Sequence, residues 1–144
     1  MFDAYEGDLT RGYKDFQDMG KVEIITCAAT HMILPLFKHI PESVRAEIHT
    51  GADQYERVFG RRPRGMWLPE NAFTPGIDKF IAEAGIKWTL LNSNGITEGD
   101  TRSFFGTDAP VISPNGVAFF GIDEETRASV WSREGGYPGH PNYK

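Results

Sequence analysis

Residues 65–91 read GMWLPENAFTPGIDKFIAEAGIKWTLL and predict a strand, a helix and a second strand in succession. Gly65–Leu68 and Trp88–Leu91 are short apolar runs, which are typical of buried strands. Between them, a threonine N-cap, a proline at the first helical position, an apolar face and a closing glycine predict a helix. These positions are Thr74, Pro75, Ile77, Phe80, Ile81, Ala84 and Gly85. A parallel pair of strands with a right-handed helical crossover follows from this order.

The alternation continues on both sides of this unit. Towards the N-terminus we expect a helix that ends at Gly20, a buried strand over 22–28 and a helix from Val44 to Phe59. Towards the C-terminus we expect a strand over 117–122. Residues 92–114 predict a long loop, and the last twenty residues show no periodicity. The predicted fold class is therefore α/β with a parallel sheet.

Composition excludes several classes of protein. The chain has 144 residues, whereas a complete (β/α) barrel takes about 250. A net charge of −5 argues against a nucleic-acid partner, and no apolar run is long enough to cross a membrane. One cysteine cannot form an internal disulfide, so a cytoplasmic location is the default. No HxH, HExxH or CxxC motif occurs, and we expect neither a metal nor a cofactor.

Polar residues follow three of the expected strands. Thr30 and His31 follow the first, Glu70 and Asn71 the second, and Asn92, Ser93 and Asn94 the third. Loops at the carboxyl ends of parallel strands converge, so these side chains are candidates for one shared cleft. Taken singly, Glu70 could be a solvated loop acid and His31 a packing residue.

Other candidates are weaker. Cys27 lies inside a strand, where a small buried side chain is a better interpretation than a nucleophile. Trp67 and Trp131 are candidate substrate-binding residues, because flat aromatic faces suit sugar rings and also suit cores. The arginines of residues 57–64 predict a solvated surface, given the acidic net charge.

Three segments together resemble glycoside hydrolase family 57, and within it the 1,4-α-glucan branching enzymes. They are VEIITCAATHMILPL (22–36), RGMWLPE (64–70) and VWSREGGYPGHPNY (130–143), in the order that the family has them. The resemblance implies that residues 1–144 are part of the family's (β/α)7 catalytic barrel, incomplete at both ends. It also implies action on α-1,4-glucans with retention and without a metal, and a place in glycogen biosynthesis.

The resemblance assigns roles to two residues. Glu70 falls on the family's catalytic nucleophile, and His31 falls on a residue that lines the donor sugar site. Retention needs a second carboxyl group as acid/base. The resemblance puts it on an Asp beyond Lys144, so we expect this chain alone to turn over slowly. Two positions differ from the family's common residues: Asn71 replaces Cys and Met32 replaces Gly.

Alternatives remain open at this point. Water instead of a second glucan would make the protein an α-amylase-like hydrolase of the same family. The chain could also bind glucan without catalysis. A metal-dependent polysaccharide deacetylase on a related barrel would need Asp and His ligands that the sequence does not show in a recognisable pattern.

Overall fold

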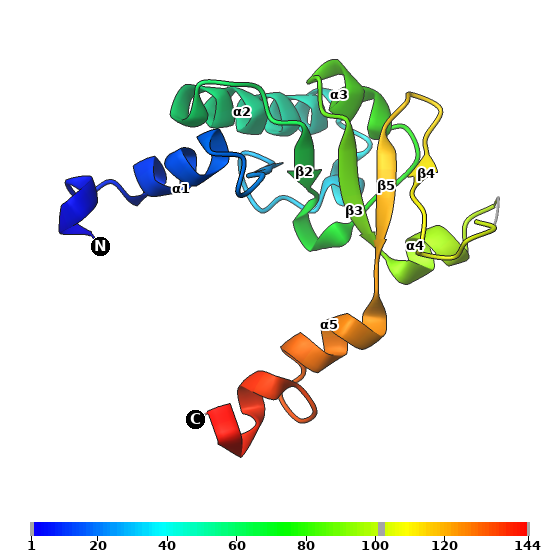
Figure 1. Ribbon diagram of the computed structural model, residues 1–144. Helices are drawn as coiled ribbons and strands as arrows, with labels where there is room; N and C mark the ends of the chain where they lie inside the picture. Colours follow the sequence, from blue (N-terminus) through cyan, green and yellow to red (C-terminus); the bar gives the residue numbers. More distant parts are fainter. Residues whose placement is uncertain (1, 101–102, 144) are drawn as a thin grey trace.

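The computed structural model describes residues 2–100 and 103–143, and it shows a five-stranded sheet with helices packed against it (Figure 1). The strands are β1 (Thr26–Cys27), β2 (Gly65–Trp67), β3 (Trp88–Asn92), β4 (Val111–Ile112) and β5 (Ala118–Ile122). The α-helices are α1 (Leu9–Asp18), α2 (Pro41–Phe59), α3 (Asp78–Glu83), α4 (Ser93–Thr97) and α5 (Glu124–Trp131). Short 3-10 turns are η1 (Asp3–Tyr5), η2 (Leu34–Phe37), η3 (Pro69–Asn71), η4 (Tyr137–Gly139) and η5 (Pro141–Tyr143).

The sheet is mainly parallel. Its strand order is β1-β2-β3-β5-β4, and β1, β2, β3 and β5 all run in the same direction. The short β4 pairs antiparallel with β5 at the end of the sheet. The β2-α3-β3 unit of residues 65–92 is present, and the predicted α/β class is confirmed.

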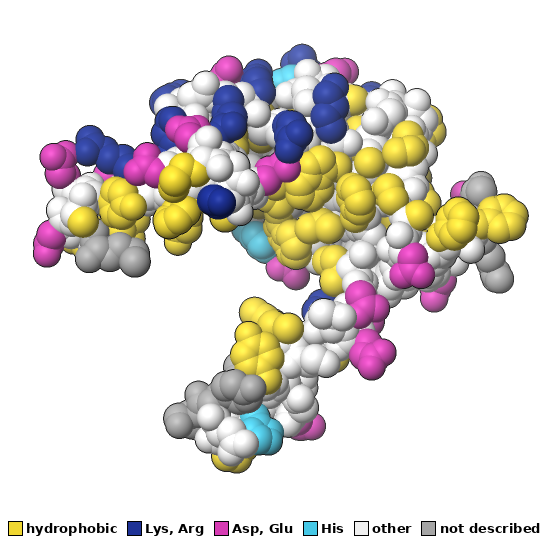
Figure 2. All heavy atoms as spheres, viewed as in Figure 1, with side chains coloured by type: hydrophobic (Ala, Val, Ile, Leu, Met, Phe, Trp, Pro, Cys, Tyr) yellow, Lys and Arg dark blue, Asp and Glu magenta, His cyan; other side chains and the backbone are white. Residues whose placement is uncertain are grey.

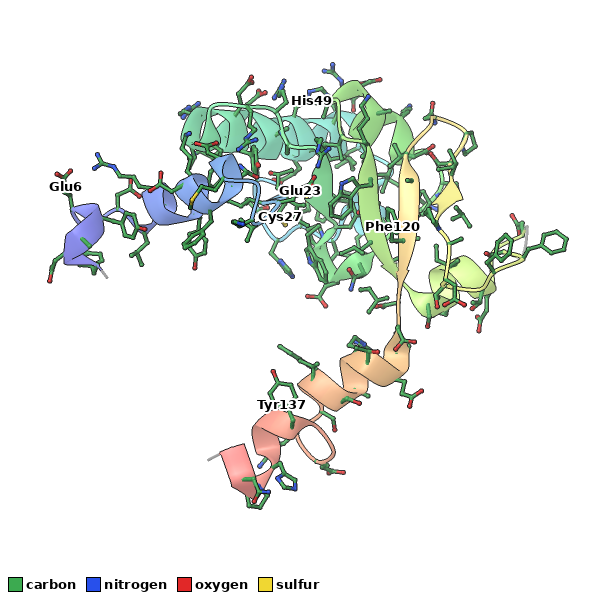
Figure 3. The ribbon with its side chains drawn as sticks, viewed as in Figure 1. Glu6, Glu23, Cys27, His49, Phe120 and Tyr137 are labelled. Atoms are coloured by element: carbon green, nitrogen blue, oxygen red, sulfur yellow. The ribbon has the colours of Figure 1, made fainter. Side chains whose placement is uncertain are left out.

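One face of the sheet carries the hydrophobic core. Met66 and Phe119 from the strands join Ile48 of α2 and Ile81 of α3 in one buried cluster. Side chains alternate along a strand, so the neighbouring position on β5 points the other way, and Phe120 is 41% exposed there (Figure 3). Figure 2 shows apolar side chains gathered over the strands on this open face.

A glycine lets α2 approach β1 closely. A Cβ at Gly51 would lie 2.1 Å from the carbonyl oxygen of Cys27, so no side chain fits there. The hydroxyl of Thr26 donates a buried hydrogen bond to the carbonyl of Gly51 at 3.0 Å. This contact fixes the end of β1, from which the loop with His31 begins.

The strand expected over 22–28 is mostly wrong, because only Thr26 and Cys27 pair with β2. Before these two residues, the side chains of Gln17 and Tyr55 form hydrogen bonds with the backbone of Ile24. The Ile24 N–H donates to Oε1 of Gln17 at 2.8 Å, and the Ile24 carbonyl accepts from the Tyr55 hydroxyl at 2.9 Å. The β-branched composition of residues 22–25 thus belongs to an exposed to half-buried segment, in which side chains instead of a neighbouring strand bond to the backbone of Ile24.

Helix boundaries also differ from expectation. The third helix begins at Asp78 and not after Thr74, because Gly76 adopts φ +97° and breaks the helical path. The expected loop of residues 92–114 contains α4 and β4. The tail contains α5, which starts from the carboxyl end of β5 and stands clear of the sheet (Figure 1). Its residues are exposed or half-buried, so the sequence of this helix lacks the apolar periodicity that predicts a packed helix.

Candidate functional site

The loops after β1 and β2 bring two of the predicted residues together at the carboxyl edge of the sheet. Nε2 of His31 lies 2.7 Å from Oε1 of Glu70, although 39 positions separate the two residues in sequence. Both side chains are accessible, at 64% and 63% exposure. A carboxylate can only accept hydrogen bonds, so His31 donates through Nε2 when Glu70 is ionised.

Glu70 is held in an unusual backbone conformation. Its φ of 58° and ψ of 19° lie in the left-handed region, and Asn71 follows with φ 51°. Residues other than glycine rarely adopt this backbone conformation, and those that do concentrate at functional sites. The turn is closed by the Asn71 N–H, which donates to the Leu68 carbonyl at 2.8 Å, and by the Ala72 N–H, which donates to the Pro69 carbonyl.

The third predicted cluster joins the same edge through an amide contact. Nδ2 of Asn71 donates to Oδ1 of Asn92, the last residue of β3, at 3.3 Å. The loop after β2 is therefore tied to β3.

The loop that carries His31 is tied to α2. The carboxylate of Glu47 accepts from the Thr30 N–H at 2.8 Å and from the Thr30 hydroxyl at 3.1 Å. The backbone carbonyl of Glu47 accepts from the Ala29 N–H at 2.9 Å. These contacts, like that between Asn71 and Asn92, were not recognised from the sequence, because each joins residues that only the packing brings together.

The remaining predicted residues lie as follows. Trp67 is half-buried at the end of β2, three positions before Glu70. Trp131 ends α5 and is 83% exposed, and α5 starts at the same edge of the sheet as the loop with Glu70. Burial raises the pKa of the Cys27 thiol, which keeps it protonated and favours the packing interpretation.

Two cavities are lined by neither His31 nor Glu70. One of about 620 Å³ borders the segments that precede β1 and β2 and is lined by Gln17, Glu23 and Arg64, among others. Arginines at this cavity already pair with carboxylates: Arg64 with Glu23, and Arg61 with Asp18. Another cavity, of about 440 Å³, lies between α2 and β1. The sequence predicts a solvated surface for these arginines, and the structure adds that they form ion pairs with carboxylates of neighbouring segments.

Within residues 2–100 and 103–143, no group of three or more His, Cys, Asp or Glu residues is arranged to hold a metal ion. In the same ranges, no helix combines the length and the apolar character that a membrane crossing requires.

Active sites of barrel enzymes lie at the carboxyl ends of their parallel strands, which is where His31 and Glu70 lie. The family model of glycosyl hydrolase family 57 matches residues 2–138. The chain therefore belongs to glycoside hydrolase family 57, and the resemblance read from the three segments is confirmed.

The chain is similar to a 1,4-alpha-glucan branching enzyme of Thermococcus kodakarensis, with 36% identity over 94% of this chain and 24% of the relative. Among solved structures, the alpha-amylase AmyC of Thermotoga maritima matches with a TM-score of 0.93 and 38% identity over 97% of this chain and 27% of that one. A family 57 branching enzyme of Pyrococcus horikoshii matches with a TM-score of 0.87 and 37% identity over 97% of this chain and 28% of that one. The chain thus spans about a quarter of the length of these relatives, and its fold is part of the family's (β/α)7 barrel.

Proposed function

We propose that Glu70 is the nucleophile of a retaining α-1,4-glucan-acting enzyme that forms α-1,6 branch points, and that residues 1–144 are part of its catalytic barrel domain. The observation that carries the proposal is the contact of 2.7 Å between His31 and Glu70 at the carboxyl edge of the sheet. The similarity to branching enzymes at 36% and 37% identity supports this choice of reaction. A cytoplasmic location and a role in glycogen biosynthesis belong to the same proposal, and a single free cysteine is compatible with them.

The chemistry has two steps. A carboxylate oxygen of Glu70 attacks the anomeric carbon of an α-1,4-linked glucan, the glycosidic C–O bond breaks, and an acid protonates the departing 4-oxygen. The acid is a second carboxyl group, expected on an Asp beyond Lys144. In the second step this group, now a base, takes the proton from a 6-hydroxyl of another glucan chain. That oxygen displaces Glu70 and restores the α configuration.

His31 has two tasks in this scheme. Its Nε2–H donates to one oxygen of Glu70, which orients the carboxylate and leaves the other oxygen for attack. The same imidazole lies at the surface, where it can contact the donor sugar. Trp67 and Trp131 are proposed as aromatic surfaces for glucan rings, since one precedes Glu70 closely and the other is exposed.

A hydrolase is the second candidate function, because the matched AmyC structure is that of an alpha-amylase. The discriminating assay uses the full-length protein that carries this chain, with amylose as substrate. Branching lowers the iodine colour and creates α-1,6 linkages, which proton NMR detects. A rise in reducing ends without new α-1,6 linkages would establish hydrolysis instead.

The role of Glu70 can be tested separately. A glycosyl fluoride such as α-maltotriosyl fluoride needs no acid to release its leaving group, so it reacts with the nucleophile alone. We expect intact-mass spectrometry of the reaction quenched before the second step to show one added maltotriosyl group, which peptide mapping places on Glu70. Glu70→Gln should remove this adduct and all turnover while glucan binding remains. Binding without any adduct or turnover in the wild type would favour a non-catalytic glucan-binding protein.

A further inference from the structure

Asn92, the last residue of β3, does not cap the helix that follows it. Asn92 occupies the N-cap position of α4, where an asparagine side chain usually accepts a hydrogen bond from the first turn of the helix. Its side chain makes no such bond to α4. Its Oδ1 accepts from Nδ2 of Asn71 instead, across 21 positions of sequence. The capping interaction has therefore been replaced by a link to the turn that carries Glu70.

The partner in this link is under two constraints of its own. Asn71 has φ 51°, and asparagine tolerates this left-handed conformation better than most residues other than glycine. Its Oδ1 is buried without a hydrogen-bond partner among the described residues. A buried polar atom without a hydrogen-bond partner is unfavourable, so another interaction must hold the Asn71 side chain in this position.

Both constraints on Asn71 bear on Glu70, because the two residues are joined by a peptide bond. The backbone of Glu70 is itself left-handed, at φ 58°. The carboxylate is exposed, and one of its oxygens contacts His31 at 2.7 Å. The turn has backbone hydrogen bonds at its two ends, from Asn71 to Leu68 and from Ala72 to Pro69. The amide link is a side-chain contact from this turn to the next strand of the sheet.

We propose that Asn71 and Asn92 form a positioning pair that fixes the direction of the Glu70 carboxylate relative to His31 and to the sugar. The pair touches neither substrate nor reacting atoms, and it acts through the backbone of Glu70. This inference rests on the proposed function of Glu70, because a direction matters only if that carboxylate attacks.

The test separates the amide link from the backbone preference of Asn71. In the full-length protein, Asn71→Gly removes the amide but allows φ above zero freely, whereas Asn92→Ala leaves Asn71 intact and removes its acceptor. We expect each variant to lower kcat about tenfold, with KM for amylose and the melting temperature little changed, since small misplacements of a reacting group are costly. Rates are expressed per folded protein, counted from the monodisperse fraction in size-exclusion chromatography, so that loss of folded protein does not count as loss of kcat.

A double-mutant cycle completes the test. If the two amides act as one unit, Asn71→Gly combined with Asn92→Ala should lower kcat no further than either change alone. The matched control is Gln54→Ala, which removes an exposed amide on α2 and should leave kcat unchanged. Wild-type kcat in Asn71→Gly or in Asn92→Ala, or losses that multiply in the double variant, would overturn the positioning pair. Full activity in Glu70→Gln would overturn the proposed function itself, so the two failures are distinguishable.

Discussion

Replacing Gly51 by alanine should destabilise the protein through a single clash between α2 and the end of β1. The added Cβ would lie 2.1 Å from the Cys27 carbonyl oxygen, 3.1 Å from the carbonyl carbon of Ala28 and 3.2 Å from the amide nitrogen of Ala29. All three are backbone atoms, so no side chain can rotate away. Either the helix or the strand end must move by roughly 1 Å to restore van der Waals contact.

The size of the effect follows from three contributions. Overpacking of this kind costs about 1–3 kcal/mol. Moving α2 also weakens the buried hydrogen bond from Thr26 to the Gly51 carbonyl, which contributes about 1 kcal/mol. Alanine is more favourable than glycine inside a helix by about 1 kcal/mol, which offsets part of the loss. The net destabilisation is about 2 kcal/mol, which lowers the melting temperature by about 4–8 °C in a protein of about 150 residues and by less in a longer one.

Calorimetric melting of the full-length protein is the assay, and Gly95→Ala is the matched control. A Cβ at Gly95, in α4, would meet only side-chain atoms of Leu91, the nearest at 3.3 Å, so the melting temperature of Gly95→Ala should not fall below that of the wild type. The clash would also displace Ala28 and Ala29, which lead to His31, so kcat should fall in Gly51→Ala and not in Gly95→Ala. Equal melting temperatures for the two variants would refute the close packing of α2 on β1.

Further predictions concern a buried acid and the proposed site. Burial raises the pKa of Asp78, but hydrogen bonds from Asn115, Ser113 and Gly76 outweigh it, so the folded pKa is below the usual value. Because the folded pKa is depressed, this stabilisation is present above the unfolded pKa of about 3.9 and is lost as pH falls through the folded pKa. Melting of Asp78→Asn at pH 7 should show a loss of about 2 kcal/mol, with a weaker dependence on acid pH than the wild type; an identical acid profile would contradict the assignment. His31→Ala should lower kcat/KM on amylose about tenfold, and a wild-type value would remove His31 from the site. Trp131→Ala should raise KM several-fold with kcat unchanged, and an unchanged KM would show that this side chain does not contact glucan.

The sequence was most informative where local chemistry and packing agree. Residues 65–91 carry their own strand, turn and helix signals, and the structure has the two strands there with one helix between them. Glu70 could be singled out because an apolar strand and a proline precede it directly. Its left-handed backbone could not, because glutamate has no preference for that region and the surrounding turn imposes it.

Other elements depended on contacts that a linear pattern does not record. Extended residues 22–25 look like a strand, yet Gln17 and Tyr55 supply hydrogen bonds to Ile24 there. The helix α5 is exposed and lacks an apolar stripe, but its start has a local signal. The Asp123 side chain accepts from the Thr126 N–H at 2.7 Å, which is an N-cap that the residues D-E-E-T could have revealed.

The sequence by itself determined the family and the α/β class, and it singled out His31 and Glu70 as the candidate pair, because those depend on residue types and on their order along the chain. Tertiary structure decided the geometry of that pair. His31 and Glu70 lie 2.7 Å apart because parallel strands β1 and β2 are neighbours and end at the same edge. Glu47 and Asn92 hold their loops from a helix and a strand that are distant in sequence. Long-range hydrogen bonds of this kind depend on how the elements pack, and that packing is a property of the folded chain as a whole.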